Sequence, residues 1–144
     1  MKGIGSLLAV PLVFWAIWGC NGSPQKTLVP VRGKLTVDGK PAVGAIVTLH
    51  PAVDDPQAVR PTGQTRADGE FELTSYYSGD GAAPGEYRVT VTWLQPQPPR
   101  SQGEGDDLPP RSLLPALYSN PGTTPLRVTI PPDKEPLVID IKRR

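Results

Sequence analysis

Residues 87–93 read Tyr-Arg-Val-Thr-Val-Thr-Trp, and this stretch decides the predicted fold. An aromatic or branched apolar side chain stands at every second position, with arginine or threonine between them. A period of two puts the two sets on opposite faces of a β-strand. The apolar set is Tyr87, Val89, Val91 and Trp93, and the polar set is Arg88, Thr90 and Thr92. We therefore predict a half-buried antiparallel strand with its apolar face on the core.

Six shorter segments outside this strand are also predicted to be strands, and all of them except 62–66 repeat the apolar alternation. They are residues 31–37, 45–49, 62–66, 71–73, 126–130 and 137–141. Turn residues separate them, and no segment carries the 3.6-residue period of an amphipathic helix. Seven short strands with turns between them predict an all-β, seven-stranded β-sandwich.

Two Asp-Gly pairs mark the tightest predicted turns. An Asp-Gly pair supplies the positive φ angles of a two-residue hairpin loop. Asp38 with its glycine therefore predicts that the strands at 31–37 and 45–49 pair as a hairpin. Asp68 with its glycine predicts the same arrangement for the next two strands.

The composition supports a loop-rich β domain. The chain has 144 residues with 19 Pro and 15 Gly, together 34 residues or about 24%, which excludes long helices. A hydrophobic content of 38% and a charged content of 20% do not fit the composition of a disordered chain. The prolines and glycines are therefore interpreted as the turns of a short-stranded domain.

The charge balance indicates which classes of ligand this chain is not expected to bind. Fifteen Lys+Arg stand against 14 Asp+Glu, and removing Lys2 with a leader leaves 14 of each sign. Nucleic acids and anionic membrane surfaces require a basic face, so neither is expected as the main ligand. The three cations Lys142, Arg143 and Arg144 are predicted to form a solvated tail.

Residues 95–114 interrupt the predicted sandwich. The segment contains five prolines, two glycines and three acidic residues. Loops longer than about 12 to 15 residues are usually functional or disordered. This composition predicts a disordered insertion and leaves an unrecognised binding segment open.

The N-terminus carries the features of an export signal. Lys2 precedes an uncharged run of fifteen residues from Ile4 to Trp18. At 1.5 Å per residue a helix of this length spans about 22 Å, short of the ~30 Å hydrocarbon core of a bilayer. A signal peptide is therefore predicted in preference to a transmembrane helix.

The joint after this run resembles the lipobox of bacterial lipoproteins. Ile17, Gly19 and Cys20 match that pattern, whereas Trp18 stands where a small residue is usual. The resemblance implies that the Cys20 sulfur takes a diacylglycerol and that cleavage precedes Cys20. Since Cys20 is the chain's one cysteine, it cannot form a disulfide within its own chain. An ordinary cleaved signal peptide and an uncleaved anchor remain the alternatives.

These features give the predicted organisation. Residues 1–19 form a signal peptide, residues 20–29 a lipidated tether, and residues 30–142 the β-sandwich with the insertion at 95–114. The lipid bilayer is the predicted partner of Cys20, and the cell envelope is the predicted location, periplasmic or surface-facing.

The order of motifs resembles the carboxypeptidase regulatory-like, transthyretin-like domain of small bacterial lipoproteins. The similar stretches are 30–51 (PVRGKLTVDGKPAVGAIVTLHP), 60–74 (RPTGQTRADGEFELT), 79–91 (GDGAAPGEYRVTV) and 118–130 (YSNPGTTPLRVTI). The resemblance implies an immunoglobulin-like or prealbumin-like sandwich. It also implies that Phe71 and Tyr87 fill the core, and it implies no known reaction.

Candidate catalytic chemistry is sparse. His50 is the one histidine, so a cluster of histidine metal ligands cannot form within one chain. Transthyretin-like hydroxyisourate hydrolases use several histidines and a C-terminal Tyr-Arg-Gly-Ser, and this sequence has neither. His50 is interpreted as an exposed residue at a strand end, and no catalytic residue, metal or cofactor is predicted.

Two sharper hypotheses concern carboxylates. Asp80, with Asp38, Asp68 and the pair Asp54-Asp55, has the oxygen ligands for Ca²⁺, but an aspartate before glycine is usually a turn residue. Lys34 and Asp140 lie on strands suited to an isopeptide bond, yet both take outward positions, which favours a solvated or cross-strand charge pair.

Three tyrosines outside the strands, Tyr76, Tyr77 and Tyr118, form a candidate ligand face.

We expect an exported, membrane-anchored, non-catalytic sandwich with a binding or structural role, with an envelope protein or a glycan as partner. A carbohydrate-binding accessory module and a transthyretin-like hydrolase are the alternatives.

Overall fold

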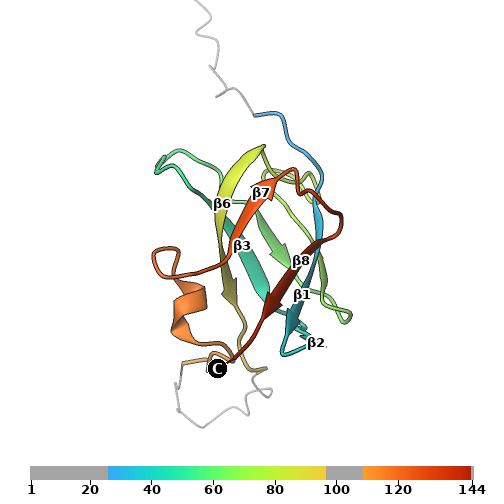
Figure 1. Cartoon of the computed structure of the whole chain (residues 1–144), viewed down its shortest axis with the longest axis vertical. Helices are drawn as coiled ribbons and strands as arrows, with labels where there is room; N and C mark the ends of the chain where they lie inside the picture. The colour runs from blue at the N-terminus through green and yellow to red at the C-terminus, as the bar shows by residue number, and fades with distance from the viewer. Residues whose placement is uncertain (1–25, 97–108, 144) are drawn as a thin grey trace, which may run out of the picture.

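The computed structural model describes residues 26–96 and 109–143 (Figure 1). This part of the chain holds eight strands, one 3₁₀ helix and no α-helix. The strands are β1 (Arg32–Val37), β2 (Lys40–Pro41), β3 (Ile46–Pro51), β4 (Thr62–Gln64), β5 (Glu70–Glu72), β6 (Gly85–Thr92), β7 (Arg127–Ile130) and β8 (Leu137–Ile141), and the helix is η1 (Ala116–Ser119).

The strands form two four-stranded sheets. In the first sheet β8 runs parallel to β1 along one edge, while β2 and β5 pair antiparallel with the two ends of β1. The second sheet has the order β4-β3-β6-β7 and is antiparallel throughout. The predicted all-β, two-sheet character is thus confirmed, and β6 lies inside its sheet between β3 and β7.

The alternating apolar side chains of the predicted strands lie in a shared core or pack against it. Val89 and Val91 of β6 are buried, as are Leu35 of β1 and Leu49 of β3. Phe71 and Tyr87 are buried too, as the resemblance implied. The period of two therefore identified the inward faces correctly.

The first hairpin prediction is wrong for the strand at 45–49. Asp38 and Gly39 have φ angles of 52° and 77°, but the turn they form joins β1 to the two-residue β2. After β2 the chain crosses to the second sheet, where Gly44 donates its N–H to the Thr65 carbonyl oxygen at 3.0 Å. Ala42 and Ala45 are fully buried along this crossing, where larger side chains would not fit.

The second hairpin prediction is also wrong in its pairing. β4 pairs with β3 in the second sheet, whereas β5 pairs with β1 in the first. Hydrogen bonds between Thr62 and Thr74 still hold the two segments together where they diverge. At this point Gly63 lies so close to β5 that a Cβ atom would stand 2.7 Å from the Glu72 carbonyl oxygen.

The insertion predicted at 95–114 is structured at both ends. Leu94 forms a bridge with Ser112, and Leu113 donates its N–H to the Trp93 carbonyl oxygen at 2.7 Å. Leu114 is buried in the core, so the prediction of disorder is wrong for this end of the segment. Residues 97–108 lie outside the described residues.

The predicted signal peptide and Cys20 also lie outside the described residues, which begin at Lys26. Val29 already exchanges two hydrogen bonds with Ala82, so the folded domain begins one residue before the predicted boundary. In the part of the chain that the structure describes, no helix has the length and apolarity to cross a membrane.

Candidate functional site

A cleft of about 390 Å³ lies where the N-terminal segment joins the sandwich. Its walls come from the segment at 26–28, the end of β3 with the loop after it, the loop beginning at Ser75, and the start of β6. The apolar lining includes Leu28, Val53, Val59, Tyr76 and Tyr87, and the polar lining includes Lys26, Asp55, Gln57 and Glu86. This mixture of apolar and charged groups suits an amphipathic ligand.

The Tyr87 ring belongs to both the core and the cleft. Its side chain is 6% exposed, and its hydroxyl donates a 2.7 Å hydrogen bond to the Ala83 carbonyl oxygen. Burial raises the pKa of this hydroxyl above its ordinary value, so the group stays protonated and keeps its donor role. Tyr87 therefore fixes the segment from Ala83 to the start of β6 as a rigid wall of the cleft.

The Asp80 carboxylate organises the loop that carries Tyr76. It accepts hydrogen bonds from the backbone N–H groups of Ser75, Tyr76 and Tyr77 at 2.7–2.9 Å. Desolvation acts to raise the pKa of Asp80, but these N–H donors outweigh it and hold the pKa below its ordinary value. Asp80 thus stabilises a turn, which is the role that the sequence favoured over a Ca²⁺ ligand. No group of three or more potential metal ligands occurs among the described residues.

The structure separates the three candidate tyrosines. Tyr76 lines the cleft near the start of β6, and its neighbour Tyr77 is 70% exposed in the same loop. Tyr118 lies in η1, which contacts β6 close to its other end through the bond from the Ser119 hydroxyl to the Val91 carbonyl oxygen. Tyr76 and Tyr77 can form one surface, whereas Tyr118 belongs to the opposite end of the sandwich.

His50 is not the exposed residue that the sequence predicted. It is half-buried on the outer face of the second sheet, and its Nε2 lies 2.9 Å from the Thr90 hydroxyl oxygen. Burial first, and then the charge of Arg60, lower the pKa of His50 below its ordinary value. No hydrogen bond to a carboxylate orients the ring among the contacts of the described residues, so a nucleophile–histidine–carboxylate arrangement is not assembled here.

The strands that carry Lys34 and Asp140 are neighbours, but the two residues do not lie opposite each other. Lys34 lies opposite Val138 in the parallel pairing of β1 and β8, and Asp140 lies opposite Thr36. The Thr36 hydroxyl donates a 2.9 Å hydrogen bond to the Asp140 carboxylate. The ion pairs among the described residues do not include Lys34 with Asp140, so the cross-strand alternative of the sequence interpretation is not formed.

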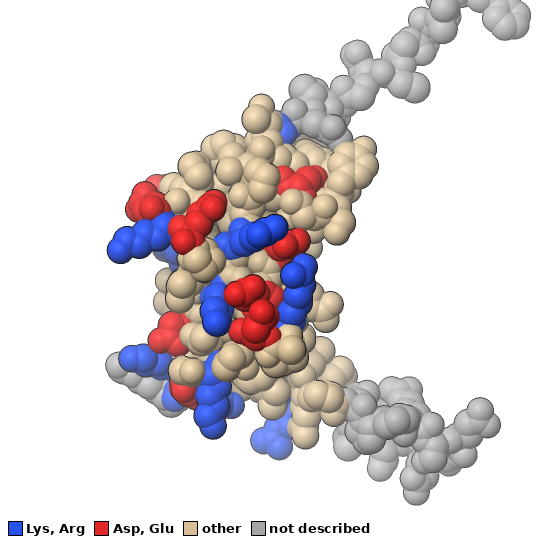
Figure 2. Space-filling view, turned by 90° about the vertical axis from the view of Figure 1, so that its right-hand side faces the viewer, with Lys and Arg blue, Asp and Glu red and all other residues tan. Residues whose placement is uncertain are grey.

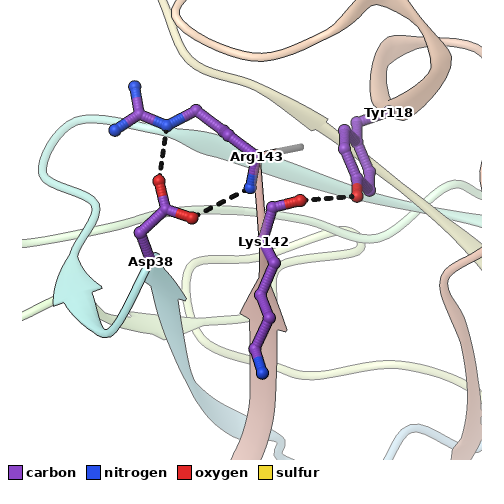
Figure 3. A network of polar contacts seen from close by, with 4 residues as sticks. All are labelled: Asp38, Tyr118, Lys142 and Arg143. Carbon is purple, nitrogen blue, oxygen red and sulfur yellow. Dashed lines mark hydrogen bonds and ion pairs between the residues drawn. The ribbon is translucent and has the colours of Figure 1, made fainter.

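The prediction of a solvated tail is wrong for Arg143. Figure 3 shows its backbone N–H and its Nε both directed at the Asp38 carboxylate, at 2.9 and 2.8 Å. Next to it, the Tyr118 hydroxyl contacts the Lys142 carbonyl oxygen at 3.5 Å. The end of β8 is thus pinned to the turn that follows β1.

Replacing Asp38 with Asn tests this contact, because asparagine also tolerates a positive φ. The Arg143 hydrogen bonds, above all, hold the pKa of Asp38 below its ordinary value of 3.8. The stabilising contribution of the ionised Asp38 carboxylate is therefore complete above pH 3.8. It disappears as the pH falls through the lower pKa that Asp38 has in the folded state. We expect D38N to lower the thermal midpoint at pH 6, and we expect the difference from the unsubstituted protein to shrink as the pH falls below 3.8. A pH-independent difference would contradict this assignment.

The face of the first sheet carries charges of both signs. Figure 2 shows acidic and basic side chains interspersed on the side that it views. Arg32 and Arg66 both lie 3.4 Å from the Glu72 carboxylate. Exposed pairs of this kind contribute little to stability, about 0–1 kcal/mol each.

The fold and the cleft define a two-sheet, all-β domain with an amphipathic cleft at the end where its N-terminal segment enters. Comparisons of the chain with family models, with curated proteins and with solved structures give no match. Val53 and Val59, in the loop after β3, line the cleft although they belong to none of the alternating segments from which strands were predicted. Two valines in a polar loop were the available signal.

Proposed function

We propose that this chain is an exported lipoprotein, anchored to a membrane through Cys20, whose β-sandwich has a non-catalytic binding or structural role at the cell envelope. The observation that carries the proposal is the sequence at the joint: fifteen uncharged residues, then Gly19-Cys20, then a polar segment. A thiol at such a joint is the acceptor that lipid attachment requires.

The position of the cleft supports a binding role. Lys26 and Leu28 line it, so the site lies at the end of the domain where the proposed tether arrives. Figure 1 shows this N-terminal segment at the end of the sandwich away from the C-terminus. A ligand in this cleft would be held close to the membrane if Cys20 carries the lipid.

The finer fold proposal is a carboxypeptidase regulatory-like, transthyretin-like sandwich of the immunoglobulin or prealbumin kind. Two observations support it. Seven strands of the described residues remain when the two-residue β2 is set aside, and the first and last of these strands, β1 and β8, pair in parallel.

The lipid anchor is tested with the full-length chain in a bacterial host. We expect the unsubstituted protein to fractionate with membranes and its N-terminal peptide to begin at a lipid-modified Cys20. Cys20→Ser should abolish the modification, whereas Ser23→Ala in the same segment should leave it intact. An unmodified Cys20 thiol, or a mature chain that begins upstream of Cys20, would overturn the proposal.

A carbohydrate-binding accessory module is the second candidate function. Tyr76 favours this function, because its aromatic ring lines the same cleft as the polar side chains of Asp55, Gln57 and Glu86. In this case Tyr76→Ala should abolish glycan binding in affinity electrophoresis, whereas Tyr118→Ala should not. A glycan array with no bound member would remove this candidate.

A further inference from the structure

The outer face of the second sheet carries a small polar pocket beside the cleft. The pocket has a volume of about 140 Å³, and residues of β3, β6 and two loops line it. Its ionisable members are His50, Asp54, Asp55, Arg60 and Arg88. Pro121 and Gly122, from the loop after η1, close one side.

Strand register brings the basic groups together. His50 of β3 lies directly opposite Arg88 of β6, so both side chains rise from the same face at neighbouring positions. Arg60 comes from the loop before β4 and is close enough to lower the pKa of His50. Three nitrogen-bearing side chains from three segments thus converge on one pocket.

Arg88, which lines this pocket, also carries an unsatisfied donor. Its Nε is buried and has no hydrogen-bond partner among residues 26–96 and 109–143. Buried polar groups in folded proteins are almost always paired, and an exception calls for an explanation by a water, an ion or a ligand. The orphaned N–H of a guanidinium is a donor that an oxyanion satisfies well.

The two aspartates do not occupy these donors. The Asp55 carboxylate accepts the backbone N–H of Gln57 within its own loop, at 2.9 Å. The ion pairs among the described residues involve Arg32, Arg66 and Arg143, and neither Arg60 nor Arg88 takes part in one.

We propose that Arg88, Arg60 and His50 form a binding site for a small oxyanion, such as the carboxylate, phosphate or sulfate group of a ligand. This site is separate from the membrane anchor and does not depend on the proposed function. The polar pocket and the amphipathic cleft share Pro51, Val53 and Asp55 in their linings. A ligand with an apolar body and an acidic end would therefore fit across both.

The site is tested by NMR on the folded chain, because His50 is the one histidine and its ring signals need no further assignment. Sulfate and acetate are titrated separately at constant ionic strength against chloride. We expect a saturable shift of the His50 signals with at least one of the two. The comparison also shows whether the site prefers a tetrahedral dianion or a planar monoanion. A bound anion should also raise the pKa of His50, since it stabilises the protonated ring.

Arg88→Gln is expected to weaken the binding about tenfold or more, because a charge-assisted hydrogen bond is lost. Arg60→Gln serves as the second variant, because Arg60 is exposed and its replacement leaves the sheet intact. Arg32→Gln, on the other sheet, is the matched control and should bind as the unsubstituted chain does. Absence of a saturable shift with both anions, or equal binding by Arg60→Gln and the control, would overturn the proposal.

Discussion

Replacing Phe71 with Ala is expected to lower the free energy of unfolding by about 3–5 kcal/mol, the usual cost of removing a buried phenylalanine ring. The Phe71 side chain is 1% exposed and lies between the two sheets. Small domains have a total stability of about 5–15 kcal/mol, so this loss is a large fraction of it. Urea unfolding followed by tryptophan fluorescence measures the change. An effect below about 1 kcal/mol would contradict this packing role.

The space for this ring is provided by two glycines. Gly33 lies directly opposite Phe71 in the pairing of β1 and β5, and a Cβ there would overlap the end of the ring. A Cβ on Gly63, from the second sheet, would stand 3.0 Å from Phe71 Cδ2. The ring therefore fills a volume that both sheets leave open.

This geometry makes the effects of the two positions depend on each other. Gly33→Ala alone should cost about 1–3 kcal/mol through overpacking. Its cost should fall by at least about 0.5 kcal/mol in a Phe71→Leu background, where the ring is gone. Val138→Ala is the control, because Val138 is 64% exposed on β8 and its replacement should change stability by no more than about 0.5 kcal/mol. Strict additivity of the two core substitutions would contradict their direct contact.

Replacing Gly81 with Ala is expected to release the N-terminal segment from the sandwich. Gly81 has a φ of 90°, and a Cβ there would overlap the Val29 carbonyl oxygen and stand 2.7 Å from Pro30 Cα. That carbonyl accepts the Ala82 N–H at 3.0 Å, and Val29 donates to the Ala82 carbonyl oxygen at 2.9 Å. The left-handed backbone conformation costs an alanine about 1–2 kcal/mol, and each of the two lost hydrogen bonds costs about 0.5–1.5 kcal/mol. The free energy of unfolding should therefore fall by roughly 2–5 kcal/mol.

Gly79 offers a matched control in the same loop. Its φ is 71°, but the nearest atom to a Cβ there is Glu72 Oε2 at an ordinary 3.5 Å. Gly79→Ala should therefore carry the left-handed strain of about 1–2 kcal/mol and no steric term. Hydrogen exchange at Val29 and Ala82 distinguishes the two variants, since only Gly81→Ala should expose these amides. Equal protection in both variants would contradict the close approach of Val29.

The inward faces of the strands were predictable because the period of two is a local property of the chain. The alternation at 87–93 was enough to identify β6 and its core side chains Tyr87, Val89 and Val91, but it did not show that Thr90 on the opposite face is buried too. The Asp-Gly turn at Asp38 was also predictable, because its positive φ angles depend on two adjacent residues.

The pairing of strands was not predictable from the same pattern. Alternation tells which side chains face inward, but it does not say which strand lies alongside. The strand at 45–49 shows this, because its alternation predicts which side chains are buried and does not specify the sheet to which the strand belongs. Hydrogen bonds to Thr65, twenty residues away from Ala45, place it in the second sheet.

The candidate sites also combine features that neighbouring residues predict with contacts that only the tertiary structure forms. The sequence by itself determined the alternating strands, the turn residues and the export-like N-terminus with Cys20, because each is written in neighbouring residues. Only the tertiary structure placed Leu28 beside Tyr76 in one cleft, His50 opposite Arg88, and Arg143 on Asp38. In each of these contacts the two residues are separated by between 38 and 105 positions in the sequence. They come together because the two sheets pack around one core.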